Sequence, residues 1–168
     1  MVSSTFRLAT PTDLPQVADL DDEAFSPYGT AESPDVFAKR LAVFPEGFIV
    51  AEDQGAIVGY GCGEKWLSLR EPVIDEDPTT THHSAGVVFC ITGMAVRLSH
   101  RGRGLGLAIA QQMVEIARQQ GCWQVVLETT HAQGLYERLG FCHAGERVQQ
   151  GIRLTIMSLD LTQESISQ

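Results

Sequence analysis

A glycine-rich loop between a strand-like run and a helix-like run constrains the fold of this chain more than any other feature. Residues 101–106 read Arg-Gly-Arg-Gly-Leu-Gly; they follow an apolar run at 87–96 and lead into an amphipathic run at 105–119. Three glycines in five residues allow a tight turn that directs successive N–H groups at one point, and the helix that begins there adds the positive end of its dipole. The loop therefore predicts a binding site for an anion such as phosphate.

Positive charge is concentrated at this loop, although the chain as a whole is acidic. Arg97, Arg101 and Arg103 place three of the twelve basic residues within seven positions, whereas the formal net charge is −9. A negative net charge argues against a general affinity for nucleic acid or for an anionic membrane surface. It suits a cationic substrate.

Several cofactors bind at glycine-rich turns before helices, and the spacing of the glycines separates them. A P-loop requires Lys followed by Ser or Thr, and no such pair occurs near the loop. A dinucleotide fingerprint would place Leu107 or Ile109 at its third small position, and it expects the turn immediately after the strand. In its favour, Glu128 ends the next strand, about where a ribose-binding carboxylate would lie. The dinucleotide-binding fold is therefore kept as an alternative.

A third spacing, Q/R-x-x-G-x-G/A, is met by Arg101, Gly104 and Gly106, and with it the chain resembles the GCN5-related N-acetyltransferase (GNAT) family. Residues 135–141, Leu-Tyr-Glu-Arg-Leu-Gly-Phe, resemble that family's second signature, L-Y-x-K-x-G-F, with Arg138 in place of Lys. Residues 91–96 resemble its fourth strand. The likeness in the order of the elements covers nearly the whole chain.

The resemblance implies a single GNAT-like domain over residues 1–168, with an α+β fold arranged as an α/β/α sandwich. Its mixed, mostly antiparallel central sheet would have about seven strands, accompanied by about four helices. Strand-like runs lie at 6–9, 47–52, 56–66, 87–96, 122–129, 141–148 and 152–161, and helix-like runs begin near residues 14, 34, 105 and 133. Asp53-Gln54-Gly55 predicts a hairpin turn. Residues 69–86 are interpreted as a long acidic loop that would cover the acceptor site.

The resemblance implies that acetyl-CoA is the co-substrate and lies where the fourth and fifth strands part. Its pyrophosphate would rest on the amides of the loop, its pantetheine would follow the fourth strand, and an N–H near Val96 would polarise the thioester carbonyl. Gly104 and Gly106 would let the pyrophosphate reach the backbone. The residues assigned to the coenzyme are Met94, Ala95, Val96, Arg101, Gly102, Arg103, Gly104, Leu105 and Gly106.

Tyr136 is the candidate general acid, because it occupies the tyrosine position of the second signature. A phenol with a pKa near 10 protonates a thiolate near 8.5 at a cost of roughly 2 kcal/mol in water, so its contribution is expected to be helpful and not absolute. A packing role in the core is the alternative.

The general base is not identified by the sequence. Some members of the resembling family use a glutamate on the fourth strand, but residues 87–96 contain no carboxylate. Glu64 and Glu128 are possible bases, acting directly or through water. His131 and the adjacent pair at 82–83 have suitable intrinsic pKa values. The family's Asn before the tyrosine segment is absent, with Thr129 near that position.

Gly93 interrupts the apolar run at 87–96. A glycine inside a strand marks a bulge, the close approach of a ligand, or a packing requirement, and the sequence leaves these open.

The composition is that of one ordinary globular domain. A chain of 168 residues with 43% hydrophobic and 20% charged residues supports one compact core. The longest apolar run, 85–96, is too short to cross a bilayer and no signal peptide is recognisable, so a cytoplasmic location is expected. Four dispersed cysteines predict reduced, buried thiols. His82, His83 and His100 show no ligand spacing with a cysteine, so no metal is expected.

The expected activity is N-acetylation of a primary amine on a small molecule or a peptide, by direct attack on the thioester. A non-catalytic acyl-CoA sensor of the same fold is the alternative, and a homodimer is left open. Some of the carboxylates before and within the first two helices would line the acceptor groove and attract cationic amines, more weakly as salt rises; a solvated helix face is the other possibility. These seven acids are Asp13, Asp19, Asp21, Asp22, Glu23, Glu32 and Asp35.

Overall fold

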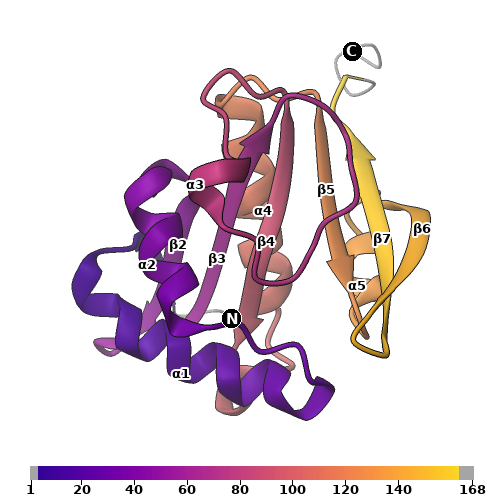
Figure 1. The fold of residues 1–168 in the computed structure, drawn as a ribbon. Helices are drawn as coiled ribbons and strands as arrows, with labels where there is room; N and C mark the ends of the chain where they lie inside the picture. Colours follow the sequence, from indigo (N-terminus) through magenta and orange to yellow (C-terminus); the bar gives the residue numbers. More distant parts are fainter. Residues whose placement is uncertain (1–3, 163–168) are drawn as a thin grey trace.

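The computed structural model describes residues 4–162, which form a seven-stranded sheet with helices on both faces (Figure 1). The strands lie in the order β1-β2-β3-β4-β5-β7-β6, and every neighbouring pair is antiparallel except the parallel pair β4–β5. This mixed, mostly antiparallel sheet confirms the expected fold class. The strands are β1 (Thr5–Leu8), β2 (Phe48–Asp53), β3 (Ala56–Trp66), β4 (Val88–Val96), β5 (Gln124–Thr129), β6 (Cys142–Gln149) and β7 (Ile152–Asp160).

Two layers of helices enclose the sheet. One face carries α1 (Leu14–Phe25), α2 (Pro34–Val43) and α3 (Pro78–Thr81), and the other carries α4 (Leu105–Gln119) and α5 (Gln133–Glu137) (Figure 1). Within residues 4–162 this makes five α-helices, one more than expected, because α3 lies inside the segment interpreted as a loop. The side chain of Asp77 caps α3 by accepting from the N–H of Thr79 at 3.0 Å, and Pro78 occupies its first position.

Two tight hairpins have the turn chemistry that their sequences predict. Gln54 and Gly55 join β2 to β3 with φ values of 51° and 81°, and Gln150 and Gly151 join β6 to β7 with 51° and 80°. Two successive residues with positive φ are characteristic of the type I′ turn, which matches the twist of the flanking strands. The register of both hairpins is thereby fixed close to the turn.

Both faces of the sheet carry core residues, because β4 and its neighbours are apolar on both faces. Ile109, Met113 and Ala117 of α4 are fully buried against one face, and Val17 and Phe37 of α1 and α2 are fully buried against the other. Three of the four cysteines, Cys62, Cys90 and Cys122, are buried free thiols, as predicted, and Cys142 is exposed. None of the helices in residues 4–162 has the length and apolar character needed to cross a membrane.

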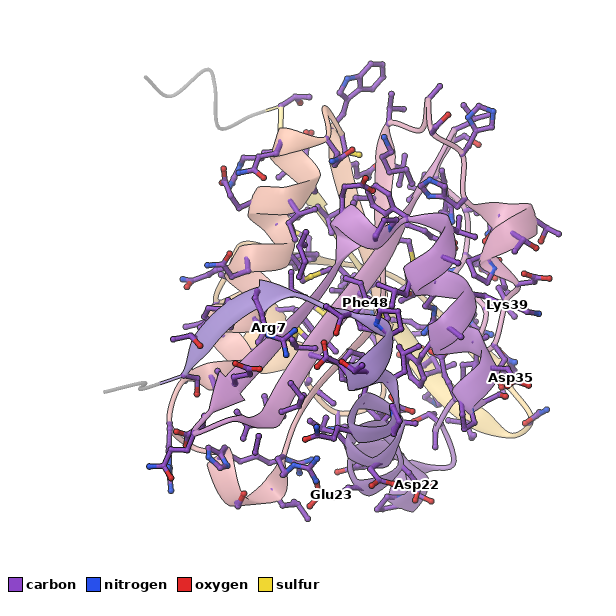
Figure 2. The ribbon with its side chains drawn as sticks, turned by 90° about the vertical axis from the view of Figure 1, so that its left-hand side faces the viewer. Arg7, Asp22, Glu23, Asp35, Lys39 and Phe48 are labelled. Carbon is purple, nitrogen blue, oxygen red and sulfur yellow. The ribbon has the colours of Figure 1, made fainter. Side chains whose placement is uncertain are left out.

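An ion pair fixes the start of α1 to β1 and β2. Arg7, which is labelled in Figure 2, donates to both carboxylate oxygens of Asp13, at 2.7 and 2.8 Å, and to Glu52. The hydrogen bonds from Arg7 lower the pKa of the buried Asp13 carboxyl to about 2.

Asp13→Asn is therefore expected to destabilise the fold by about 1–2 kcal/mol at pH 7, a figure that allows for the partial exposure of Arg7. A carboxylate whose pKa is depressed in the folded state stabilises it above the unfolded pKa, so the difference between parent and variant should shrink as pH falls from about 4 toward 2. Urea unfolding across this range measures it, with the exposed Asp19→Asn as the control. A difference that does not change with pH would contradict the assignment.

Candidate active site

The sheet opens between its two parallel strands. β4 and β5 pair only at Val88 with Gln124, Phe89 with Val125, and Cys90 with Val126. Beyond Cys90, β4 stays paired with β3 as far as Val96, and β5 stays paired with β7 to its end. The two strands therefore part in the middle of the molecule (Figure 1), and a cavity of about 450 Å³ lies there.

Most of the residues assigned to the coenzyme from the sequence line this cavity. Eight of these nine residues line the cavity. They lie in the second half of β4, in the loop before α4 and at the start of α4. Arg103 is the exception and is exposed. The strand segment and the glycine loop are thus brought to the same cavity.

The loop has the backbone conformation that an anion site needs. Gly102 and Gly104 adopt left-handed conformations with φ values of 77° and 82°, and Gly104 is the N-cap of α4. A Cβ at Gly104 would have no described protein atom within 4 Å, so the space before the helix N-terminus is open to a ligand. At Gly106 a Cβ would lie 3.1 Å from Leu135 of α5, so that glycine serves helix packing as well. The N-terminus of α4 therefore fits a phosphate group.

The backbone of β4 presents N–H groups to the opening. The N–H of Arg97 donates to the carbonyl of Val58, which continues the β3–β4 pairing. Because successive residues of an antiparallel strand alternate in hydrogen-bonding direction, the N–H groups of Val96 and Met94 point away from β3. Consistent with this, the carbonyl of Val96 accepts from Nε of Arg101, at 3.1 Å. The open edge of β4 can thus pair with an extended amide-containing chain.

Tyr136 lies in the cavity wall on α5. Its ring packs edge-on against Phe141, with 5.6 Å between ring centres, and its hydroxyl lies 3.9 Å from the sulfur of Met94 on β4. Burial raises the pKa of this phenol above its ordinary value. Tyr136 therefore stays protonated near neutral pH and can donate a proton but not accept one.

The two carboxylates named as possible bases are both held by other residues. Glu128 lines the cavity, but its two oxygens accept from Nε and a terminal nitrogen of Arg147, each at 2.5 Å. The structure places Glu64 outside this cavity, where it accepts from the indole N–H of Trp66 and the hydroxyl of Thr81 and so fastens α3 to β3. Arg147 compensates the charge of Glu128, and Glu64 does not line this cavity, so the surroundings of these two carboxylates do not favour either as the base.

The candidate histidines divide between the cavity and the far loop. His82 and His83 accept backbone N–H groups of Lys65 and Ala85 and do not line the cavity. His131 does line it and stacks on Tyr28, with 4.0 Å between ring centres. Burial lowers the pKa of His131, which favours its neutral form.

Thr129 lies near the position at which an Asn is expected from the family resemblance. Its hydroxyl oxygen accepts the N–H of Ala132 at 2.9 Å and so shapes the turn between β5 and α5. Within residues 4–162, no group of three or more His, Cys, Asp or Glu side chains is arranged to hold a metal ion.

Comparison with known proteins agrees with this geometry. Residues 14–141 match the model of the Acetyltransferase (GNAT) family. The chain belongs to this family. It is 30% identical over 179 residues to the L-methionine sulfoximine/L-methionine sulfone acetyltransferase of Pseudomonas aeruginosa, covering 95% of this GNAT chain and 96% of that protein.

Other relatives match over shorter segments, and solved structures share the GNAT fold. The probable glucosamine 6-phosphate N-acetyltransferase 2 of Oryza sativa is 35% identical over 72 residues, covering 42% of this chain and 40% of that protein. The match thus spans less than half the length of that relative. The structure of yncA from Salmonella typhimurium with its cofactor acetyl-CoA superimposes with a TM-score of 0.68 at 20% identity, covering 95% of each chain.

Two of the seven acids before and within the first two helices line the cavity of this GNAT chain, namely Asp21 and Glu32. The other five lie elsewhere: Asp13 pairs with Arg7, Glu23 lies 3.6 Å from Arg97, and Asp19, Asp22 and Asp35 are exposed, the last two on the outer sides of α1 and α2 (Figure 2).

The two lining acids belong to a buried polar cluster between α1, α2 and β3. Asp21 accepts from the hydroxyl of Tyr60 at 2.5 Å and from the N–H of Glu32 at 2.9 Å, and Glu32 forms an ion pair with Arg40. Burial raises the pKa of both carboxyls above their ordinary values. The sequence pattern indicated this cluster. Asp21 and Arg40 lie on the buried faces of their helices, at positions where the helical spacing predicts apolar residues.

Proposed function

We propose that this chain transfers the acetyl group of acetyl-CoA to the primary amine of a small molecule. The observation that carries the proposal is the position of the cavity between the parted strands, where the glycine loop, the open edge of β4 and Tyr136 meet. The space before Gly104 fits the pyrophosphate, and the N–H groups of Met94 and Val96 fit the pantetheine. Family membership supports the same assignment.

The residues of the cavity would divide the chemistry between them. The N–H of Val96 would stabilise the negative charge that develops on the thioester oxygen when the amine nitrogen attacks. The Tyr136 hydroxyl would donate a proton to the sulfur as the carbon–sulfur bond breaks. A phenol is already protonated at physiological pH at its ordinary pKa, and burial raises the pKa of Tyr136 further, so the donor is available but is a weaker acid than a free phenol.

A small acceptor is favoured over a peptide by two observations. The relative that matches along nearly its whole length is named for two small amino-acid derivatives, L-methionine sulfoximine and L-methionine sulfone. The acceptor side of the cavity is bounded by α1 and by Ile74 from the segment between β3 and β4, which would limit the size of an acceptor. A sensor of the same fold would bind acetyl-CoA in the same cavity without turnover.

Release of coenzyme thiol with a panel of primary amines tests the function. Amines with cationic, neutral and acidic tails should react in that order of kcat/KM, because Asp21 and Glu32 face the acceptor. The order should persist at high ionic strength, since salt screens buried charges much less than exposed ones. Tight acetyl-CoA binding with no thiol release from any amine would favour the sensor instead. Equal kcat/KM values for the three kinds of amine would show that Asp21 and Glu32 do not determine which acceptor is preferred.

A further inference from the structure

Two tyrosine hydroxyls approach β4 from opposite faces at neighbouring residues. The hydroxyl of Tyr136 contacts Met94, and a Cβ at Gly93 would lie 2.8 Å from the hydroxyl of Tyr60. Successive residues of a strand point to opposite faces of the sheet, so these two contacts lie on the two sides of one short segment. The proposed acid is on the α5 side, and Tyr60 is on the side of α1 and α2.

Gly93 is the residue that lets Tyr60 come so close. The β3–β4 register shifts there, since Cys62 pairs with Gly93 and Gly63 pairs with Ile91, which leaves Thr92 as an extra residue. Any side chain at Gly93 would collide with the Tyr60 ring, whose atom Cε2 would lie 3.1 Å from a Cβ. The bulge and the glycine together place the Tyr60 hydroxyl, and the Asp21 carboxylate bound to it, beside the open segment of β4.

Asp21 retains hydrogen-bonding capacity toward the cavity. Its two oxygens each accept one bond, from Tyr60 and from the N–H of Glu32, whereas a carboxylate has about four acceptor positions. Asp21 is only 2% exposed, so a cation that binds it is shielded from water. The hydroxyl oxygen of Thr30, which also lines the cavity, is buried and has no hydrogen-bond partner among residues 4–162. A buried hydroxyl without a protein partner requires one from outside the chain, and a bound water or a ligand can supply it.

We infer that Asp21 binds the ammonium group of the acceptor and takes its proton, and that Tyr60 is the residue that positions Asp21. This inference rests on the proposed N-acetyl transfer. Glu32 is the weaker choice because its carboxylate is already paired with Arg40. Asp21, Glu32 and Arg40 carry a net charge of −1 when both carboxyls are ionised, which an entering ammonium neutralises.

The step balances with these residues alone. The ammonium nitrogen gives one proton to an Asp21 oxygen, and its freed lone pair forms the bond to the thioester carbon. The carbon–sulfur bond breaks, and the thiolate takes the proton of Tyr136. The nitrogen then loses a second proton, which restores the phenol, and Asp21 returns its proton to solvent. The products are the amide, the coenzyme thiol and one proton.

The surroundings of Asp21 make it a stronger base than a surface carboxylate. Burial is the main cause that raises the pKa of Asp21, while the hydrogen bonds from Tyr60 and from the N–H of Glu32 oppose the shift. A raised pKa brings the carboxyl closer to neutral pH, where a general base is most effective. The titratable and charged groups that face it are Tyr60 and Cys62 on β3, Glu32 before α2, Arg40 on α2, and Asp75 between β3 and α3.

Asp21→Asn tests the inference, with the neighbouring exposed Asp22→Asn as the matched control. At pH 7, kcat/KM of Asp21→Asn should fall by about 10²-fold or more, and that of the control should not change. The loss should shrink as pH rises toward the pKa of the amine, because an unprotonated amine needs no base. Acetyl-CoA affinity, measured by calorimetry, should stay within about twofold, since Asp21 lies on the acceptor side.

Tyr60→Phe gives an independent readout that also serves if Asp21→Asn does not fold. Removing the Tyr60 hydrogen bond should raise the pKa of Asp21 further and move the acidic limb of the kcat/KM profile to higher pH. An unmoved limb, or an Asp21→Asn enzyme within about threefold of the parent at every pH, would overturn the inference. If the parent protein releases no thiol with any amine, the proposed function itself fails.

Discussion

Replacing Gly104 with valine is expected to abolish acetyl-CoA binding and to leave the fold intact. The backbone at Gly104 has a φ of 82°, and the space in front of its Cα is open and belongs to the cavity lining. Two methyl groups there would hold the pyrophosphate away from the N–H groups of the loop, which are its main partners at a helix N-terminus. The affinity should fall by at least about 100-fold, which corresponds to about 2.7 kcal/mol.

Gly121→Val supplies the control, because Gly121 lies beyond the opposite end of the same helix. Its φ is 77°, and a Cβ there would likewise contact no described atom within 4 Å. Both variants therefore carry a similar backbone strain, of about 1–2 kcal/mol for a side chain in the left-handed region. Calorimetry on the two folded proteins separates strain from ligand exclusion. Equal acetyl-CoA affinity in both would remove the loop from the coenzyme site.

Tyr136→Phe should lower kcat by about 10²-fold with little change in acetyl-CoA affinity. The substitution deletes one hydroxyl and keeps the ring, so the contact with Phe141 and the packing of α5 are retained. What would be lost is the proposed proton donor for the departing thiolate. Steady-state kinetics on the best amine of the panel measure the effect.

Tyr28, which stacks on the cavity-lining His131, provides the comparison for this variant. Tyr28 is 42% exposed, and among residues 4–162 its contact is the stack of its ring on His131, so Tyr28→Phe should retain the activity of the parent. A Tyr136→Phe enzyme within about twofold of the parent would show that Tyr136 serves packing alone.

The sequence predicted the parts of the fold that depend on local chemistry. Gln54-Gly55 requires a tight hairpin, Ser33-Pro34 starts α2 where it was expected, and the glycine loop precedes α4. The helix α3 was missed although Asp77-Pro78 carries a similar start signal. The acidic residues and prolines around this signal indicated a loop. A helix of a single turn is also too short to show the apolar periodicity by which helices are predicted.

Only those parts of the candidate site that lie within one short segment could be predicted from the sequence. The coenzyme loop and Tyr136 each lie within a short motif, and both line the cavity. The pairing of Glu128 with Arg147 joins residues 19 apart on strands that are not adjacent, and Tyr60 meets Asp21 across 39 residues. Such contacts arise from tertiary packing, so the sequence could name Glu128 as a base without indicating that its charge is already compensated.

The parting of β4 and β5 also links the folded population of this protein to the supply of its own coenzyme. Three residue pairs join β4 to β5, and within residues 4–162 the facing edges of the two strands beyond these pairs are not paired with each other. A coenzyme bound across that seam stabilises the folded chain and has no site in the unfolded one. At a concentration one hundred times its Kd, the gain is about 2.7 kcal/mol, a large fraction of the stability of an ordinary domain. Under the proposed function, a shortage of acetyl-CoA would slow the enzyme and also shorten its lifetime against proteolysis.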